Sequence, residues 1–383
     1  MLGPFQAFRR SEWRTPTVLC SRRGLPRCVS SPYSQSLFSC VALLSFVFAI
    51  RVESRLERDG PGVRDSLPSA PSQPETCYPP SFSLFWIVVS AGLWFVVASL
   101  PVHRIPLLFV PAQVRERVLQ QVRDARRTLM DATDGEAERE KKTAAKDFLV
   151  SVRNRSVGFV HASIISVLSL ACVTLDKQLI DDKIFGCSPL FTVTGIILTG
   201  YFLWDFCVIL WHWTPAAPQW LLHCAVSVIT AANPFLVLPG EPPMCFYAAS
   251  LILFELSTPF LALRYFMLRA YVFHPSPADG KSEGDAKLTQ NGEKGGARTL
   301  PRCYTLVSVC FFLAFFLVRI LWGLGWMLPS LLVFLSNGDG ALFRPWRRYI
   351  FYASVPLFSA LNLYWLYMIV ESVLCKRQKK KQQ

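Results

Sequence analysis

The sequence predicts an all-α membrane protein, a polytopic bundle of about seven transmembrane helices with a short hydrophobic segment near the N-terminus. Of the 383 residues, 52% are hydrophobic and 17% are charged, whereas a soluble domain carries about a quarter charged residues. Seven stretches also supply the roughly 20 mostly apolar residues that a helix needs to cross a bilayer. These stretches are 81–101, 156–175, 190–213, 220–238, 244–267, 304–322 and 348–374.

The region before the first span contains the short hydrophobic segment. Residues 1–36 form an Arg- and Ser-rich leader, and residues 37–50, "LFSCVALLSFVFAI", are apolar but shorter than a membrane span. This pattern is typical of a signal-peptide core or a marginal signal anchor, and both alternatives stay open, as does cleavage. Because a positive leader favours the cytosol, residues 51–80 are expected to form a linker in the lumen.

Charge differences between the loops orient the spans. Residues 102–149 contain basic runs such as "RERVLQQVRDARR", so we expect this segment in the cytosol. The polar loop 274–303 and the basic tail 375–383 are expected on the same side. One basic patch opposes this orientation because it precedes the last span on the lumenal side: Arg344, Arg347 and Arg348. The net charge of +14 fits basic cytosolic loops, so we expect no nucleic-acid partner.

The carboxyl end carries a candidate localisation signal. Lys380 and Lys381, here called the dilysine pair, occupy the fourth and third positions from the end. This arrangement looks like the dilysine retrieval signal of endoplasmic-reticulum membrane proteins. It predicts a multi-pass protein of that membrane with a cytosolic C-terminus and coat machinery as a partner. The alternative is a tail that is basic only because of the positive-inside bias.

Ionisable residues inside the spans are the candidate functional residues, because such side chains are costly in hydrocarbon and usually face a cavity or a partner. Arg319 is expected toward the lumen. At a rise of about 1.5 Å per residue, six others fall in the cytosolic half or near mid-membrane: His161, Asp205, His212, His223, Glu255 and Arg264. They form either one lipid-binding pocket reached from the cytosolic leaflet or separate polar ties between helices, each worth about 0.6–2 kcal/mol.

Sequence motifs for cofactors and metals are not found. The chain has no GxGxxG, Walker, HExxH or GxSxG motif, and of its 12 cysteines Cys20 and Cys28 have no zinc spacing. We therefore expect no cofactor and no metal site. Most cysteines lie in or beside spans, where cysteine behaves as a small hydrophobe. Cys77 and Cys187 both fall in predicted lumenal segments, so a disulfide between them is one possibility.

Four stretches together resemble the TLC-domain family. "NRSVGFVH" at 154–161 is similar to the segment that opens this domain, and "GYFLWDF" at 200–206 to its Gly-Tyr-x-x-x-Asp stretch. "FELSTPFLALRYF" at 254–266 is the most specific match, and "FFLVRI" at 315–320 fits the penultimate span. The resemblance covers roughly 150–374. It implies a bundle of about seven helices that handles lipid in the endoplasmic reticulum, in a family that includes ceramide synthases and translocation-associated membrane proteins.

The most specific of these stretches places an acid and a helix-breaker inside an apolar span. Pro259 cannot donate to the backbone ladder, so it is expected to kink the helix and to free the carbonyl of Glu255. Ser257 and Thr258 can satisfy freed backbone groups. The result is either one wall of a lipid head-group pocket or a packing kink with a tied glutamate.

Three hypotheses for function are open. The first is a non-catalytic protein that senses, binds or moves membrane lipids. The second is an N-acyltransferase of ceramide-synthase type, with sphingolipid or acyl-CoA as ligand and His223, Asp205 and Cys224 as catalytic residues. The family's synthases carry adjacent histidines that can act as base or nucleophile, but here Cys224 follows His223. The expectation is therefore a protein that is not an enzyme.

The third hypothesis is a membrane cargo or translocation accessory protein. It draws on the helix-like spacing of "VRERVLQQVRDARRTLM" within the basic segment 102–149. The same segment fits a helix that lies on anionic lipid. The lipid species and the oligomeric state are left open by the sequence.

Overall fold

The computed structural model describes residues 80–131, 135–213, 217–237, 241–272, 302–336 and 342–381, and these ranges contain helices and no strand. The N-terminal leader, the hydrophobic segment 37–50, most of the linker 51–80 and most of the polar loop 274–303 lie outside the described residues. The all-α prediction is confirmed for the part of the chain that is described.

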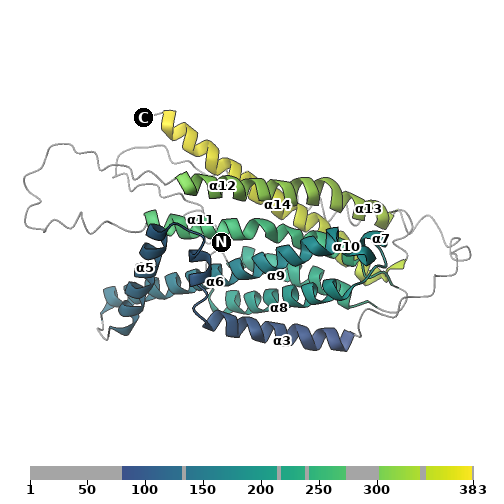
Figure 1. Ribbon diagram of the computed structural model, residues 1–383, viewed down its shortest axis with the longest axis horizontal. Helices are drawn as coiled ribbons and strands as arrows, with labels where there is room; N and C mark the ends of the chain where they lie inside the picture. The colour runs from purple at the N-terminus through teal and green to yellow at the C-terminus, as the bar shows by residue number, and fades with distance from the viewer. Residues whose placement is uncertain are drawn as a thin grey trace, which may run out of the picture. The chain divides into compact units, whose positions relative to one another are not determined.

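The helices follow one another in chain order as shown in Figure 1. They are α3 (Pro80–Ser99), α4 (Arg104–Leu107), α5 (Ala112–Met130), α6 (Glu136–Thr174), α7 (Lys177–Asp181), α8 (Pro189–Trp211), α9 (Ala217–Ala232), the 3-10 turn η2 (Asn233–Phe235), α10 (Cys245–Ile252), the 3-10 segment η3 (Leu253–Ser257), α11 (Thr258–Val272), α12 (Arg302–Phe315), the π-helical segment η5 (Phe316–Met327), α13 (Leu328–Ser336) and α14 (Pro345–Lys381).

Five continuous helical stretches are long and apolar enough to cross a membrane. They are Glu138–Thr174, Pro189–Trp211, Cys245–Ala270, Arg302–Ser336 and Pro345–Ser372. The first and fourth predicted spans coincide with two shorter apolar helices, Ser83–Ser99 and Trp220–Phe235. The described residues thus contain five candidate membrane-spanning helices, and the count of seven stays a prediction.

The sixth predicted span is longer than the sequence indicated. The hydropathy pattern predicts 304–322, but the helix runs on to Ser336 through the π-helical segment η5 and α13. Gly323, Gly325 and Pro329 follow the predicted end, and such residues usually end a helix. Here the backbone widens into a π-helix over Phe316–Met327 and continues as an α-helix.

The described helices divide into two compact units. Unit 1 comprises Met1–Phe95, Ile165–Phe254 and Phe315–Gln383, and unit 2 comprises Val96–Ile164 and Glu255–Ala314.

In unit 1, α3 packs closely against α8 (Figure 1). A Cβ atom at Gly200 would lie 2.5 Å from Oγ of Ser90, so only glycine allows the two backbones to approach this far. The indole of Trp94 donates to the carbonyl of Ile197 at 3.3 Å. Helix α8 begins after Ser188, whose hydroxyl accepts from the backbone N–H of Phe191 at 3.1 Å and caps the helix.

In unit 2, α5 is amphipathic and packs on α11. Val114, Val118 and Val122 recur every four residues on one side of α5, and all three are buried. Their partners on α11 in the same hydrophobic cluster include Phe266 and Met267. The side chain of Gln121 donates to the carbonyl of Arg269 at 3.3 Å and adds a polar tie between the two helices.

Candidate functional site

The first site is a polar and aromatic cluster among the apolar helices of unit 1, centred on Arg319. Arg319 lies on the π-helical segment η5, and its side chain is 6% exposed. Its Nε donates to the backbone carbonyl of Phe254 at 3.1 Å, and Nη1 donates to Oδ1 of Asn362 on α14 at 3.1 Å. A buried charge needs such partners, because an unpaired one in hydrocarbon is expensive.

The bond from Arg319 is made to a residue in the irregular helical stretch between α10 and α11. Pro259 stands at the start of α11, and the preceding residues Leu253–Ser257 form a 3-10 turn. Such a change of helix type leaves backbone carbonyls without their usual helical donors. The prediction placed a freed carbonyl at Glu255, and the structure gives the carbonyl of Phe254 a side-chain donor from another helix.

Aromatic rings surround the Arg319 guanidinium. Its Cζ lies 5.7 Å from the ring centroid of Phe254, 5.5 Å from that of Phe315 and 5.1 Å from that of Trp365. Contacts at this distance attract a cation through the ring quadrupole, and the attraction grows where water is excluded. Arg319 is therefore held by both hydrogen bonds and aromatic rings.

Trp365 connects Arg319 to His223. The two ring centroids of His223 and Trp365 lie 5.4 Å apart, edge to face. Phe202 and Trp220 also contact the imidazole, at 5.7 and 6.3 Å. The Nδ1 atom of His223 is buried and has no hydrogen-bond partner in the part of the chain that is described. A buried polar atom of this kind suits a ligand that brings its own donor or acceptor.

Two further predicted residues meet beside this cluster. Sγ of Cys224 donates to Oδ2 of Asp205 at 3.1 Å and ties α9 to α8. Cys224 is fully buried. Reactive cysteines carry a thiolate stabilised by positive neighbours, whereas this thiol donates to a carboxylate. The name "unit 1 cluster" is used below for Asp205, His223, Cys224, Arg319, Asn362 and Trp365.

The remaining predicted pocket residues have other positions. His212 is the C-terminal cap of α8. His161 is buried on α6, and Glu255 is buried in η3. Nε of Arg264 donates to the hydroxyl of Tyr304 on α12 at 3.1 Å, which is the kind of tie between helices that the second interpretation expects.

The predicted pocket residues are divided between the two units. Asp205, His212 and His223 belong to unit 1, and His161, Glu255 and Arg264 belong to unit 2. Of these residues, Asp205 and His223 belong to the unit 1 cluster and lie on the neighbouring helices α8 and α9. The convergence of all six on one pocket stays a prediction.

Three members of the unit 1 cluster are not among the site residues predicted from the sequence: Arg319, Asn362 and Trp365. Arg319 was recognised as an ionisable residue within a span but was expected elsewhere. Asn362, in "SALNLYW", is a buried amide inside an apolar helix, which is itself a signal of a polar partner. Trp365 carries no such signal, because one tryptophan among many in a membrane helix is unremarkable.

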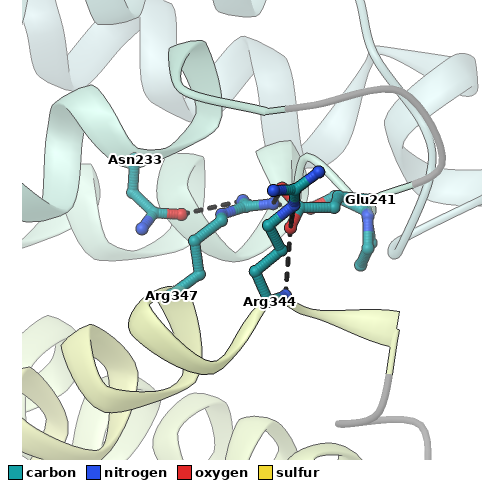
Figure 2. Close-up of polar contacts among 5 residues, drawn as sticks. Asn233, Glu241, Arg344 and Arg347 are labelled. Atoms are coloured by element: carbon teal, nitrogen blue, oxygen red, sulfur yellow. Dashed lines mark hydrogen bonds and ion pairs between the residues drawn. The ribbon is translucent and has the colours of Figure 1, made fainter.

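A second buried charged cluster joins three segments of unit 1 (Figure 2). Arg347 is fully buried at the start of α14, and its Nη1 donates to Oε2 of Glu241 at 3.1 Å. Its Nη2 donates to Oδ1 of Asn233 at 2.9 Å and to the carbonyl of Pro242 at 3.1 Å. The backbone N–H of Arg344 donates to Oε1 of Glu241 at 3.0 Å. Two arginines of the basic patch that opposes the charge rule are thus partners of a buried acid.

Some predicted features involve cysteines and metal ligands. Cys187 is disulfide-bonded. Cys172, Cys207, Cys224, Cys245, Cys303 and Cys310 are not disulfide-bonded. The pairing with Cys77 stays a prediction.

Groups of three or more His, Cys, Asp or Glu that could hold a metal ion are not found among the described residues. The backbone of the dilysine pair forms the end of α14.

These features define a helical membrane protein that holds polar and charged side chains between its apolar helices. Comparison with known families matches residues 151–371 to the TLC domain, over more than half of the chain. The chain therefore belongs to the TLC-domain family, as its motifs indicated.

A relative of similar type is an uncharacterized TLC domain-containing protein of Schizosaccharomyces pombe. It is 21% identical over 218 residues, which cover 57% of this chain and 63% of that protein. The alignment thus spans a little less than two thirds of the relative's length.

Proposed function

We propose that this protein binds membrane lipid without catalysis and acts in lipid homeostasis in the endoplasmic reticulum, by sensing, holding or moving a lipid. The observation that carries the proposal is His223. Its Nδ1 is buried without a hydrogen-bond partner among the described residues, and its ring is enclosed by Phe202, Trp220 and Trp365. A polar lipid group can satisfy this atom while its chain lies on the aromatic rings.

The charged members of the cluster support a binding role over a catalytic one. Arg319 donates to Phe254 and Asn362, and Cys224 donates to Asp205. Groups held in this way shape a wall, whereas a nucleophile needs a neighbouring base that takes its proton. Localisation to the endoplasmic reticulum is supported by the dilysine pair, and the lipid role by membership of the family.

Lipid analysis of the purified chain tests the proposal. The full-length protein is extracted gently, and its bound lipids are identified by mass spectrometry. We expect one lipid class to be enriched over the bulk membrane. His223→Phe keeps an aromatic ring but removes the polar atom, so it should lose that class while keeping thermal stability. His274→Phe, in the predicted polar loop, is the matched control. Bulk lipid composition in the wild type would refute the proposal.

A second candidate function is N-acyl transfer, because Asp205, Cys224 and the adjacent His223 lie together on α8 and α9. This candidate predicts that purified protein forms ceramide from a sphingoid base and acyl-CoA. We expect no product above background. Turnover that disappears in His223→Ala would make the protein an acyltransferase and would replace the first proposal.

A further inference from the structure

A second lipid contact is indicated in unit 2, where the chain leaves α3 and enters α5. The connecting helix α4 is fixed on one side, because Leu107 and Val110 are buried in the cluster that holds α5 on α11. The two residues that follow α4 are apolar and largely exposed: Leu108 is 67% exposed, and Phe109 is 63% exposed although its ring also contacts Phe159. Exposed apolar residues of this size mark a contact with lipid or with a partner.

Positive charge lies directly beside these apolar residues. Arg104 begins α4, and Arg126 comes from the last turns of α5. Arg104 follows His103 directly, and Val122, one turn before Arg126, is buried in the same cluster as Leu107 of α4. Burial, and then the charges of Arg126 and Arg104, also hold the pKa of His103 below its usual range. The three side chains thus gather cationic and hydrogen-bonding groups from two helices in one place.

The acids of α5 do not neutralise this group. Glu116 lies 3.8 Å from Arg115, and Asp124 lies 3.9 Å from Arg127. Neither Arg104 nor Arg126 makes an ion pair or a side-chain hydrogen bond within the described ranges. An anion can therefore be bound without displacing any existing partner.

Helix α5 is held in a fixed position on α11, so its exposed arginines are also fixed in position. Three valines of α5 pack on α11, and Gln121 donates to the carbonyl of Arg269. Figure 1 shows α5 running across the direction of α11, both within unit 2. Arg126 continues the row of the three valines by one turn and is exposed. A helix that lies across a spanning helix and carries exposed arginines has the character of an interfacial helix.

We infer that His103, Arg104 and Arg126 bind the phosphate of an anionic phospholipid whose acyl chains lie on Leu108 and Phe109. The adjoining end of α3 favours lipid over a free anion or an acidic protein. Val96 in the last turn of α3 and Leu100 just after it are exposed, as Leu108 and Phe109 are. The apolar surface thus continues from the apolar helix α3 to the basic group, which matches the order of chain and head group in a phospholipid.

The test uses the full-length protein in detergent micelles that contain equal amounts of phosphatidylserine and phosphatidylcholine. Native mass spectrometry counts each lipid that stays bound. We expect a clear preference of the wild type for phosphatidylserine. Arg104→Gln with Arg126→Gln should lower that retention about 30-fold, since each basic residue near an anionic surface contributes about fivefold. Arg115→Gln with Arg127→Gln removes the same charge from already paired arginines and should lower it less than about threefold.

Further arms separate lipid from other occupants and from misfolding. Millimolar inorganic phosphate should leave phosphatidylserine bound, because phosphate makes no apolar contact. Leu108→Ser with Phe109→Ser should lower lipid retention, and Arg104→Lys with Arg126→Lys should keep it even if the Gln variants do not fold. The inference is wrong if the wild type shows no lipid preference or if phosphate displaces the lipid. It is also wrong if the two double arginine-to-glutamine variants lower phosphatidylserine retention by the same factor. This outcome is independent of His223 and the unit 1 cluster.

Discussion

Glu241 should be the residue whose charge matters most for the stability of unit 1. Its carboxylate accepts from the guanidinium of Arg347 and from the backbone N–H of Arg344 (Figure 2). The change Glu241→Gln keeps the shape and one acceptor oxygen but removes the negative charge. Arg347, which is 0% exposed, would then keep its positive charge without a counter-ion among the described residues.

The expected size follows from the burial of both partners. Removing one partner of a buried ion pair costs about 3–5 kcal/mol, because the other charge stays desolvated. Arg347 keeps its bonds to Asn233 and to the carbonyl of Pro242, so the lower end, about 3 kcal/mol, is expected. The ion pair of Arg344 adds little, because that side chain is largely exposed. At about 2–4 °C per kcal/mol, the melting temperature should fall by about 6–12 °C.

A thermal-unfolding assay of the purified protein in detergent measures this change. The matched control is Glu116→Gln, which makes the same substitution in the exposed pair with Arg115 and should cost less than about 1 kcal/mol. Arg347→Met in the Glu241→Gln background should recover part of the loss, since it removes the unpaired charge. Equal melting temperatures for Glu241→Gln and Glu116→Gln would refute the reasoning.

Three other features give shorter tests. Gly323→Ala would place a Cβ atom 2.3 Å from the ring of Phe254 and should cost about 1–3 kcal/mol in a thermal-unfolding assay. The control Gly325→Ala meets only a carbonyl at 3.5 Å and should be neutral or stabilising; an equal loss would contradict the packing argument. Peptide mapping without reductant should find Cys187 linked to Cys77, and a different partner would correct the predicted lumenal pairing. Changing the dilysine pair to serine should release the protein to the Golgi on microscopy, whereas unchanged localisation would leave the tail merely basic.

The helices were largely predictable, because hydropathy over a window of about 20 residues depends on composition and not on partners. The same method failed at the end of the sixth span. Gly323, Gly325 and Pro329 are helix-ending residues by local propensity, and the continuation to Ser336 runs through a π-helix that local propensity does not encode. The two shorter apolar helices lie within predicted spans because their sequences are apolar. They are shorter than the predicted spans because hydropathy does not report where a helix begins and ends.

The candidate site was predictable only in part. Asp205 and His223 stand out because charged or polar side chains are rare within spans, and the structure places them on neighbouring helices α8 and α9. Which residue pairs with which depends on long-range packing: Glu241 and Arg347 are separated by 106 positions along the chain. The sequence therefore indicates that partners must exist, but not which ones they are.

Phe254 in the 3-10 segment η3 contacts the π-helical segment η5 through both its backbone and its ring. The 3-10 turn that ends at Ser257 leaves the carbonyl of Phe254 available, and Arg319 on the π-helical segment donates to it. The ring of the same residue lies where a Cβ atom of Gly323 would be, one turn further along the π-helix. The π-helical segment η5 thus contacts Phe254 in two ways. Arg319 donates to its backbone carbonyl, and Gly323 leaves room for its ring. These contacts of Phe254 place Arg319 beside Trp365 and, through that ring, beside His223.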